Sequence, residues 1–436
     1  MPLALPKKGS HLIMYGFNLA NGVLHADDVS LIDIAAAHGT PTYVYSKSAI
    51  EERWHALDQA FGSYPHSIHY AVKANSNIAV LSVLAQLGSG FDIVSGGELY
   101  RVLEAGGDAS KVVFSGVAKS VQDIRYALEK GVGSINVESL AELERIQTVA
   151  QDIKKTARSA LRVNPNVDPQ THPYISTGLE TAKFGIPIES AVSVYEVADA
   201  MSHVEVHSVA CHIGSQITKT SPFSDAIEII LDLVEALANK GIRIQQLDLG
   251  GGLGIQYKDE SPPAPSDYIN SMLDCIKKRG LNLPVAIEPG RTIVGNAGVL
   301  LTRVEYLKTN SSKNGTKHFC MVDAGMNDLM RPALYQAYHD IVAVTPSKNT
   351  PAQTLDVVGP VCESADVLGA DRELSVVSGD LLAIKGAGAY SFVMASNYNS
   401  RPRPCEIMVD GTQTYVVRKR ESLADLVSSE NTLPSL

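Results

Sequence analysis

The sequence predicts an α/β protein whose larger part is a (β/α)8 barrel of the TIM type, followed by an antiparallel β domain. Between residues 40 and 300, short runs rich in strand-forming residues alternate with longer stretches that carry apolar residues at helical spacing. The alternation supplies eight strand candidates, which favours a closed barrel over an open doubly wound sheet. After residue 300 the helical spacing mostly disappears, and short alternating runs separated by turn-forming segments take over.

The expected barrel strands follow one another at regular intervals: Ser67–Val72, Gly90–Val94, Lys111–Phe114, Gly133–Val137, Ala160–Val163, His207–His212, Gln245–Leu249 and Leu283–Ile287. The expected helices are Ala49–Phe61 before the first strand and then Ile78–Leu87, Ser120–Lys130, Ser139–Thr148, Glu189–Ala200, Phe223–Lys240 and Asp267–Arg279. Several of them end at a glycine, the residue that most often follows a helix.

The second region is expected to contain the strands Leu300–Lys308, His318–Val322, Ile341–Thr345, Gln353–Val358, Leu381–Ile384, Glu406–Val409 and Thr414–Arg418. A strand-like run at Ile13–Asn18 precedes the barrel and is expected to join this sheet. The sequence therefore predicts a barrel at residues 40–295 and a β domain built from residues 1–39 and 296–436.

Composition and charge exclude several classes of function. The chain has 436 residues, 45% of them hydrophobic, so it can bury a barrel-sized core and is long enough for two domains. A net charge of −10 without a basic stripe argues against nucleic acid as a partner, and no apolar run is long enough to span a membrane. The five cysteines are scattered, without the spacing of a zinc site, so we expect no metal and a reduced, cytoplasmic protein.

Polar residues lie at the ends of five of the expected barrel strands, where barrel enzymes carry their active sites. They are Lys73 after strand one, Asp92 in strand two, His212 and Ser215 at strand six, Gly250, Gly251 and Gly252 after strand seven, and Glu288, Gly290 and Arg291 after strand eight. Their convergence on one face of the barrel indicates an active site more strongly than any single motif does.

Each of these residues also has an ordinary structural explanation. Taken alone, Lys73 is typical of a solvated strand end, His212 of a buried core, and Glu288 with Arg291 of an ion pair. However, Lys73 follows an apolar run, where loss of water would favour the neutral amine that attacks an aldehyde. The glycine run allows backbone N–H groups to approach a phosphate, and it lacks the GK[ST] ending of a nucleotide-binding loop.

An aldehyde-binding lysine, a phosphate-binding loop and a carboxylate together suggest pyridoxal 5'-phosphate as the cofactor. A carboxylate such as Glu288 would keep the pyridine nitrogen protonated, and the ring would then withdraw the electrons released when a Cα bond breaks.

The motifs YAVKAN at 70–75, HIGS at 212–215, GGGLG at 250–254 and EPGR at 288–291 resemble those of the fold-type III, alanine-racemase-like pyridoxal-phosphate decarboxylases. The resemblance covers nearly the whole chain. Further motifs are similar to those of the diaminopimelate decarboxylase family: HPYISTG at 172–178, KFG at 183–185, RPALY at 331–335, GPVCES at 359–364 and GAY at 388–390. No catalytic position departs from the family pattern.

The resemblance implies decarboxylation of meso-2,6-diaminopimelate to L-lysine and CO2, the last step of lysine biosynthesis, by a homodimer with shared active sites. It implies that Lys73 forms an imine with the cofactor, that His212 stacks on its ring, and that Glu288 pairs with the pyridine nitrogen. The phosphate-binding residues would be Ser215, the glycines at 250–252, Gly290, Arg291 and Tyr390, with Asp92 and Arg162 supporting the pocket.

On the substrate side, the resemblance implies that Arg291, Arg331 and Tyr335 bind the distal carboxylate, near Tyr390. Glu363 would bind the distal ammonium, and Cys362 would give a proton to the carbanion left by CO2. Taken alone, Cys362 is more typical of a small buried hydrophobe. In the family, the Cys362–Glu363 segment enters the active site of the partner subunit.

Three alternatives stay open at this point. An amino-acid racemase of the same fold would share the lysine and the phosphate loop, but such racemases pair the pyridine nitrogen with an arginine, and Glu288 stands there. A related decarboxylase could act on another basic amino acid such as arginine, or on carboxynorspermidine, and Arg331, Tyr335 and Glu363 argue against it. A non-catalytic regulator would be expected to lack Lys73 or Cys362.

Overall fold

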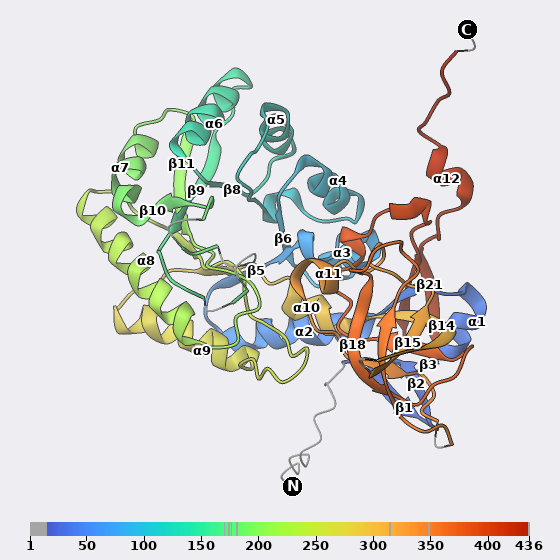
Figure 1. Cartoon of the computed structure of the whole chain (residues 1–436). Helices are drawn as coiled ribbons and strands as arrows, with labels where there is room; N and C mark the ends of the chain where they lie inside the picture. Colours follow the sequence, from blue (N-terminus) through green and yellow to red (C-terminus); the bar gives the residue numbers. More distant parts are fainter. Residues whose placement is uncertain are drawn as a thin grey trace.

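The computed structural model describes residues 15–434 except 170, 173, 174, 176, 180, 181, 314 and 348. The chain forms a helix-covered barrel and, beside it, a domain of β-strands (Figure 1). Three residues of the motif at 172–178, namely Pro173, Tyr174 and Ser176, lie outside the described residues, as do Ile13 and Met14 of the expected first strand.

Eight parallel strands close the barrel, which confirms the predicted fold class. In order around the barrel they are β5 (His66–Ala71), β6 (Gly90–Ile93), β7 (Val112–Phe114), β8 (Ser134–Val137), β9 (Ala157–Asn164), β11 (Val204–Ala210), β12 (Gln246–Asp248) and β13 (Val285–Ile287). The circle closes where β13 pairs with β5, with Ile287 opposite Ile68. A two-residue strand, β10 (Ile186–Pro187), pairs with the end of β9 outside the circle.

The helices of the barrel include one that the sequence pattern did not predict. Their bounds are α2 (Lys47–Phe61), α3 (Ile78–Gln86), α4 (Gly96–Glu104), α5 (Val121–Lys130), α6 (Leu140–Asp152), α7 (Ile188–Asp199), α8 (Ser221–Asn239) and α9 (Pro265–Lys278). Helix α4 was missed because it begins with Gly96 and Gly97, which are more typical of a turn. The Ser95 hydroxyl caps it by accepting a hydrogen bond from the Glu98 N–H at 3.2 Å.

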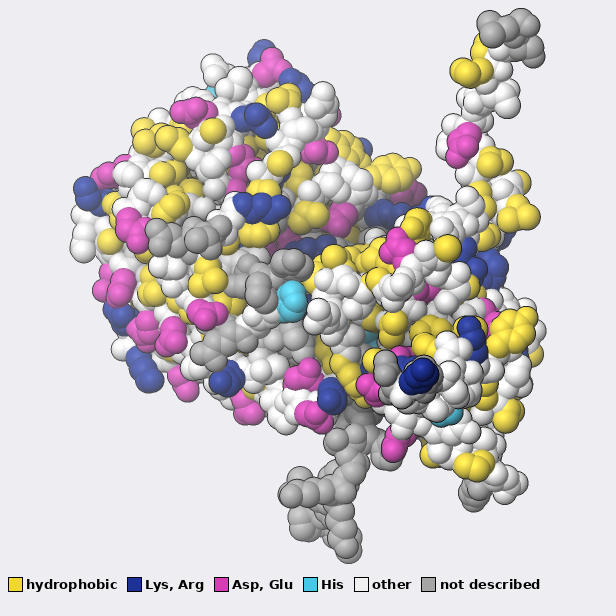
Figure 2. All heavy atoms as spheres, viewed as in Figure 1, with side chains coloured by type: hydrophobic (Ala, Val, Ile, Leu, Met, Phe, Trp, Pro, Cys, Tyr) yellow, Lys and Arg dark blue, Asp and Glu magenta, His cyan; other side chains and the backbone are white. Residues whose placement is uncertain are grey.

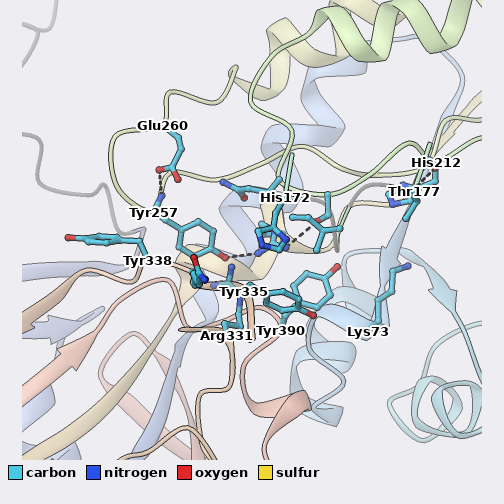
Figure 3. Close-up of a pocket in the computed structure, with 16 residues that line it drawn as sticks. Lys73, His172, Thr177, His212, Tyr257, Glu260, Arg331, Tyr335, Tyr338 and Tyr390 are labelled. Carbon is cyan, nitrogen blue, oxygen red and sulfur yellow. Dashed lines mark hydrogen bonds between the residues drawn. The ribbon is translucent and has the colours of Figure 1, made fainter. Parts of the chain in front are cut away.

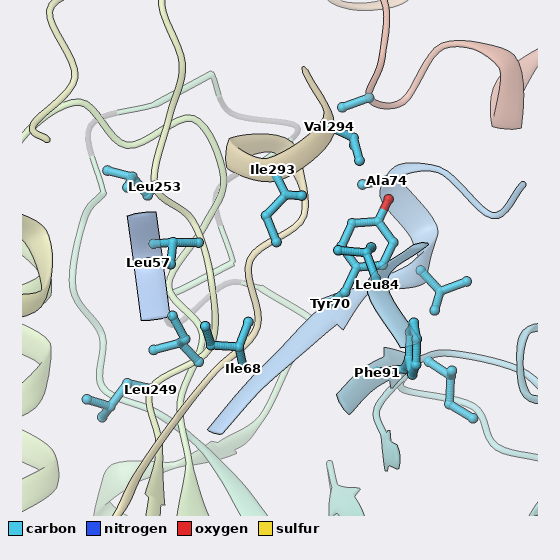
Figure 4. Packing of buried hydrophobic residues seen from close by; sticks show 14 of the residues in the cluster. Leu57, Ile68, Tyr70, Ala74, Leu84, Phe91, Leu249, Leu253, Ile293 and Val294 are labelled. Atoms are coloured by element: carbon cyan, nitrogen blue, oxygen red, sulfur yellow. The ribbon is translucent and has the colours of Figure 1, made fainter. Parts of the chain in front are cut away.

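The apolar core extends from the barrel strands to the surrounding helices. Ile68 and Tyr70 of β5 and Phe91 of β6 are buried and lie close to the end of the strand that leads to Lys73 (Figure 4). Burial of each such side chain stabilises the fold by roughly 1.5–3 kcal/mol. The strand end that carries Lys73 is therefore held by closely packed residues.

The β domain forms one nine-stranded sheet, in which seven strands follow one path and two lie beside it. Its strands are β4 (Thr42–Ser46), β14 (Gly298–Ser312), β15 (Gly315–Val322), β16 (Ile341–Ala343), β17 (Gln353–Val358), β18 (Val367–Leu374), β19 (Leu381–Ile384), β20 (Cys405–Asp410) and β21 (Gln413–Arg418). Most pairs are antiparallel as predicted, but β15 pairs in parallel with β17, and β4 with β20. Strand β18 was not predicted, because Gly369 and Asp371 interrupt its apolar alternation.

The N-terminal strand pairs differently from the prediction. Phe17 and Asn18 belong to β1 (Phe17–Ala20), which forms a separate three-stranded sheet with β2 (Val23–Ala26) and β3 (Val29–Ser30). Helix α1 (Leu31–His38) follows. The strand that joins the second sheet is β4, which lies between β14 and β20. Five residues inside the range 40–295 therefore belong structurally to the β domain.

Charged side chains of both signs are mixed over the visible face of the barrel, without a large patch of one sign (Figure 2). In the described part of the chain, no helix is both long enough and apolar enough to cross a membrane.

Candidate active site

The predicted site residues meet in two adjoining cavities at the C-terminal end of the barrel, facing the β domain. An inner cavity of about 180 Å³ is lined by residues that include Asn136, Arg162, Asp248 and Glu288. An outer cavity of about 440 Å³ is lined by Ser215, Tyr257, Arg291, Arg331, Tyr335 and Tyr390, among others. Both cavities share Lys73, Thr177 and His212, so these residues lie where the two join.

Lys73 lies in a short 3-10 turn (Val72–Ala74) directly after β5, with its side chain 35% exposed towards the cavities. Its Nζ donates a hydrogen bond to Oδ2 of Asp92, which is fully buried in β6. Burial lowers the pKa of the amine, but the negative charges of Asp92 and Glu288 outweigh that effect, and the net pKa is raised. The prediction that loss of water makes this amine neutral was therefore wrong, because it left out the buried carboxylates.

Three polar side chains form the far wall of the inner cavity. The Asn136 amide nitrogen of β8 lies 3.1 Å from Asp248 Oδ2 and 3.2 Å from Glu288 Oε1. Burial raises the pKa of Glu288 well above its ordinary value, and the nearby charges of Asp248 and Asp92 raise it further. Burial and these charges therefore favour the protonated form of Glu288, and the Lys73 ammonium opposes them. A cationic ring nitrogen placed there would stabilise the carboxylate.

His212 follows β11 and is neutral. Burial lowers its pKa well below the ordinary value, and the charges of Arg162 and Lys73 lower it further. The Gly251 N–H donates to Nδ1 of His212 at 3.2 Å, so Nδ1 carries the lone pair and Nε2 the proton. A neutral ring with a fixed tautomer can lie flat against an aromatic cofactor without repelling a cationic ring nitrogen.

The three glycines after β12 are required by close packing as much as by any ligand. A Cβ on Gly251 would lie 2.2 Å from the Glu288 carbonyl oxygen, and one on Gly252 would lie 2.5 Å from the Gly214 carbonyl oxygen. The Gly250 N–H donates to Asp248 Oδ1 at 3.0 Å, and the Gly251 N–H is used by His212. Within the described residues, the run therefore leaves only the Gly252 N–H for a phosphate.

Arg291, the first residue of the short helix α10 (Arg291–Val294), lines the outer cavity beside Ser215 and Tyr390. Its guanidinium donates to Ser215 Oγ at 3.1 Å and lies 4.8 Å from the centre of the Tyr390 ring. Tyr390 has a left-handed backbone (φ 54°), and its N–H donates to the Ala74 carbonyl at 2.8 Å. Gly290 fits because a Cβ there would lie 2.9 Å from Ala74.

At the other end of the outer cavity, helix α11 (Arg331–Tyr335) brings Arg331 and Tyr335 into the site from the β domain (Figure 3). Arg331 and Arg291 are both buried, and both contact Tyr257. Neither arginine forms an ion pair with an acidic residue of the described chain, and each has a buried Nε without a hydrogen-bond partner there. Two buried cations without a protein counter-ion indicate that the ligand supplies the negative charge.

Arg162 of β9 lies beneath the site and connects it to the barrel wall. Its Nη1 donates to Glu138 Oε1 at 2.8 Å, and its Nη2 donates to the His212 carbonyl at 3.3 Å. The other oxygen of Glu138 accepts the Gly185 N–H at 2.7 Å. Glu138 thus joins Arg162 to Gly185, which directly follows Phe184 of the cavity lining.

Asp92 and the predicted glycines lie behind the lining residues, whereas Cys362 and Glu363 lie away from both cavities in the single chain. Both are exposed, and neither lines the space around Lys73. The Cys362 N–H donates to Asn399 Oδ1 at 3.0 Å, and the Tyr398 hydroxyl donates to Glu363.

Sequence reasoning missed Asn136, Asp248 and Tyr257. For the first two a signal existed, since each is a polar residue at or next to the C-terminal end of a barrel strand, where barrel enzymes carry their active sites. For Tyr257 the sequence contains no such signal, because this residue lies in the turn-like run Gln256–Asp259 and only the fold places it between two arginines.

Known proteins with the same arrangement are similar over nearly the whole chain. A family model described as "Pyridoxal-dependent decarboxylase, pyridoxal binding domain" matches residues 47–295. The diaminopimelate decarboxylase of Pseudomonas aeruginosa is 55% identical over 418 residues, covering 96% of this chain and 99% of that protein. That of Vibrio cholerae is 53% identical over 414 residues, covering 95% and 98%. The crystal structure of diaminopimelate decarboxylase from Helicobacter pylori complexed with L-lysine aligns with a TM-score of 0.87 at 42% identity, covering 92% and 98%.

Proposed function

The chain belongs to the diaminopimelate decarboxylase family of pyridoxal-dependent decarboxylases, and on this basis we propose that it converts meso-2,6-diaminopimelate to L-lysine and CO2, the last step of lysine biosynthesis. One observation carries the substrate assignment. The cavity that begins at Lys73 is lined by two buried arginines, Arg291 and Arg331, that have no acidic partner in the described part of the chain. A substrate with a second amino-acid head supplies the missing carboxylate, and the planar guanidinium suits it.

The residues present fit pyridoxal 5'-phosphate. The inner cavity has carboxyl groups at its far wall for a ring nitrogen, and Lys73 lies where both cavities join. The outer cavity offers Ser215 and Tyr390 to a phosphate, together with the backbone at Gly252 and Gly290–Arg291. When bound, pyridoxal phosphate supplies an electron-withdrawing ring that takes up the electron pair released from Cα as CO2 leaves.

Each side chain at the cofactor then has a distinct task. Lys73 would hold the cofactor through its aldehyde, and Asp92, which accepts a hydrogen bond from the Lys73 amine, would orient that amine. Neutral His212 supports the ring face, and Glu288 holds the proton of the ring nitrogen. Arg162 acts indirectly, since it fixes the backbone that carries His212.

The substrate end is expected to take two residues from outside the single chain. Arg291, Arg331 and Tyr335 are positioned to bind the distal carboxylate. The acidic residue of this lining, Glu260, already accepts hydrogen bonds from the Tyr257 and Lys258 N–H groups at 3.0 and 2.7 Å. We assign binding of the distal ammonium and protonation of Cα to Glu363 and Cys362 of a second copy in a homodimer. Their exposure in the single chain supports this assignment.

The dimer proposal is tested by mixing inactive variants. Lys73→Ala and Cys362→Ala subunits are each expected to be inactive as homodimers. In mixed dimers, one of the two sites contains both intact residues, so part of the activity should return. Verified mixed dimers without any activity would contradict the shared site.

The decarboxylation itself is tested by incubating the cofactor-loaded protein with meso-diaminopimelate, L-lysine, L-ornithine and L-arginine and measuring CO2 release. We expect release from diaminopimelate alone, and preference for arginine would overturn the substrate assignment. Borohydride reduction followed by peptide mapping should locate the cofactor on Lys73, with Lys73→Ala as the control.

Two further assignments belong to the proposal. The five cysteines are all free thiols, which supports a reducing, cytoplasmic location. The functional division remains a barrel at 40–295 and a β domain from 1–39 and 296–436, with the amendment that β4 belongs to the β domain.

A further inference from the structure

His339, a residue without a predicted role, lies next to Arg331 of the β domain. Its side chain is fully buried. Its Nε2 lies 2.7 Å from Arg331 Nη1, and its Nδ1 lies 2.8 Å from the carbonyl oxygen of Lys385. Because a carbonyl can only accept a hydrogen bond, Nδ1 carries the proton, and Nε2 accepts from Arg331. The ring is therefore neutral and has one tautomer.

The second support of Arg331 is also uncharged. The guanidinium carbon lies 4.5 Å from the centre of the Tyr257 ring, and the Tyr257 hydroxyl accepts from Arg291 Nη1 at 2.7 Å. The edge of the His339 ring contacts the same tyrosine, with 5.4 Å between ring centres. Tyr257 thus separates the two guanidinium groups, and Figure 3 shows it beside Arg331, at the opposite end of the cavity from Lys73.

This arrangement is unusual for a buried arginine, which is normally paired with a carboxylate. Among the described residues, the groups that fix Arg331 and Arg291 are an imidazole, tyrosine side chains and a serine hydroxyl. A carboxylate in the place of His339 would hold Arg331 equally well but would cancel its charge. A neutral acceptor holds the direction of the guanidinium and leaves the charge available.

We propose that His339 is a positioning residue whose neutral imidazole orients Arg331 without neutralising it, and that the outer cavity thereby selects ligands with a carboxylate at the end remote from the cofactor. The inference rests on the proposed function, because it concerns the same site. It adds a residue that touches neither cofactor nor substrate and yet determines which amino acids bind.

The test compares two nearly isosteric replacements in the cofactor-loaded enzyme. His339→Gln keeps a neutral acceptor for Arg331, whereas His339→Glu keeps an acceptor and adds a negative charge. The ligands are L-lysine and 1,5-diaminopentane, which differ only in the carboxylate, and binding is followed by the absorbance of the cofactor. We expect wild type and His339→Gln to prefer lysine, and His339→Glu to lose about 10- to 100-fold of that preference, as expected for one charge-assisted interaction.

A merely structural role would affect the two variants alike, so equal lysine preference in His339→Gln and His339→Glu would overturn the proposal. Thermal melting establishes whether both variants fold. If the glutamate variant does not, His339→Leu replaces it, because it removes the acceptor without adding charge. The proposal then requires a lower lysine preference in His339→Leu than in His339→Gln, and equality of the two would refute it.

The outcome is independent of the decarboxylation assay. Wild type that releases no CO2 from diaminopimelate would remove the proposed function, while the binding comparison would still decide the role of His339. Conversely, if wild type decarboxylates diaminopimelate but His339→Gln and His339→Glu show equal lysine preference, only the role of His339 is overturned.

Discussion

Replacement of Glu138 by glutamine should weaken both the fold and the cofactor site, because one buried carboxylate holds two separate parts of the protein. Its oxygens accept hydrogen bonds from Arg162 at 2.8 Å and from the Gly185 N–H at 2.7 Å, and the side chain is 3% exposed. A glutamine retains one acceptor oxygen and turns an NH2 group towards the other donor. Arg162, whose side chain is 10% exposed, loses its counter-ion.

The magnitude follows from this burial. Removal of one partner of a buried ion pair typically costs about 3–5 kcal/mol, since the remaining charge stays out of water. Because glutamine keeps one of the two hydrogen bonds, we expect Glu138→Gln to lower the free energy of unfolding by about 3 kcal/mol, the lower end of that range. Because Arg162 also supports the His212 backbone, the affinity for pyridoxal phosphate should fall together with the free energy of unfolding.

Urea unfolding followed by circular dichroism measures the first effect, and titration of the cofactor absorbance measures the second. Glu235→Gln is the matched control, since Glu235 pairs with Arg279 at 3.2 Å on the surface and Arg279 keeps two other carboxylates. We expect little change in the control. A Glu138→Gln protein as stable as the control, with unchanged cofactor affinity, would refute the assigned role of Glu138.

Two further predictions concern the outer cavity. Tyr257→Phe removes a buried hydrogen bond to Arg291, and a lost bond of this charged kind costs about 1.5–3 kcal/mol, so the affinity for lysine or cofactor should fall at least about tenfold. Tyr195→Phe, whose hydroxyl bonds only backbone carbonyls away from the cavity, should leave both affinities unchanged; a similar loss in both variants would contradict the prediction. Burial, with the charge of Arg331, lowers the pKa of His339 well below 6.5. Below that pH the unfolded chain therefore binds a proton that the folded chain does not, and the free energy of unfolding falls as the pH falls. Urea unfolding at several pH values from about 7 to 5 should therefore show a shallower decline for His339→Gln, by up to about 1.4 kcal/mol per pH unit, and identical slopes would argue against a neutral His339.

The barrel was predictable because its strands are continuous apolar runs separated by amphipathic helices, and such a pattern is local. The same locality explains the elements that were missed. Helix α4 begins with Gly96 and Gly97. A Cβ on Gly96 would lie 2.6 Å from the Asp123 Oδ1 atom, so a larger residue does not fit there. Strand β18 contains Gly369 and Asp371, and its register with β17 shifts at that point.

For the site, the sequence identified which residues lie at the strand ends but not how they act on one another. The pKa of Lys73 depends on Asp92 and Glu288, which come from two other strands. The N–H groups of Gly250 and Gly251 are occupied by Asp248 and His212, which only the folded loop brings near. Charges and hydrogen bonds between distant segments are therefore the part that a pattern along the chain cannot contain.

Strand β4 has a consequence for how the molecule is made. Thr42 and Cys405 are paired across 363 positions, and β4 lies between β20 and β14 in the second sheet. While the ribosome is still synthesising the barrel, neither neighbour of residues 42–46 exists, and β4 has both of its neighbours only after the end of β20 has emerged. A fragment that stops at the end of the barrel would keep that unpaired strand, and would be expected to aggregate through it.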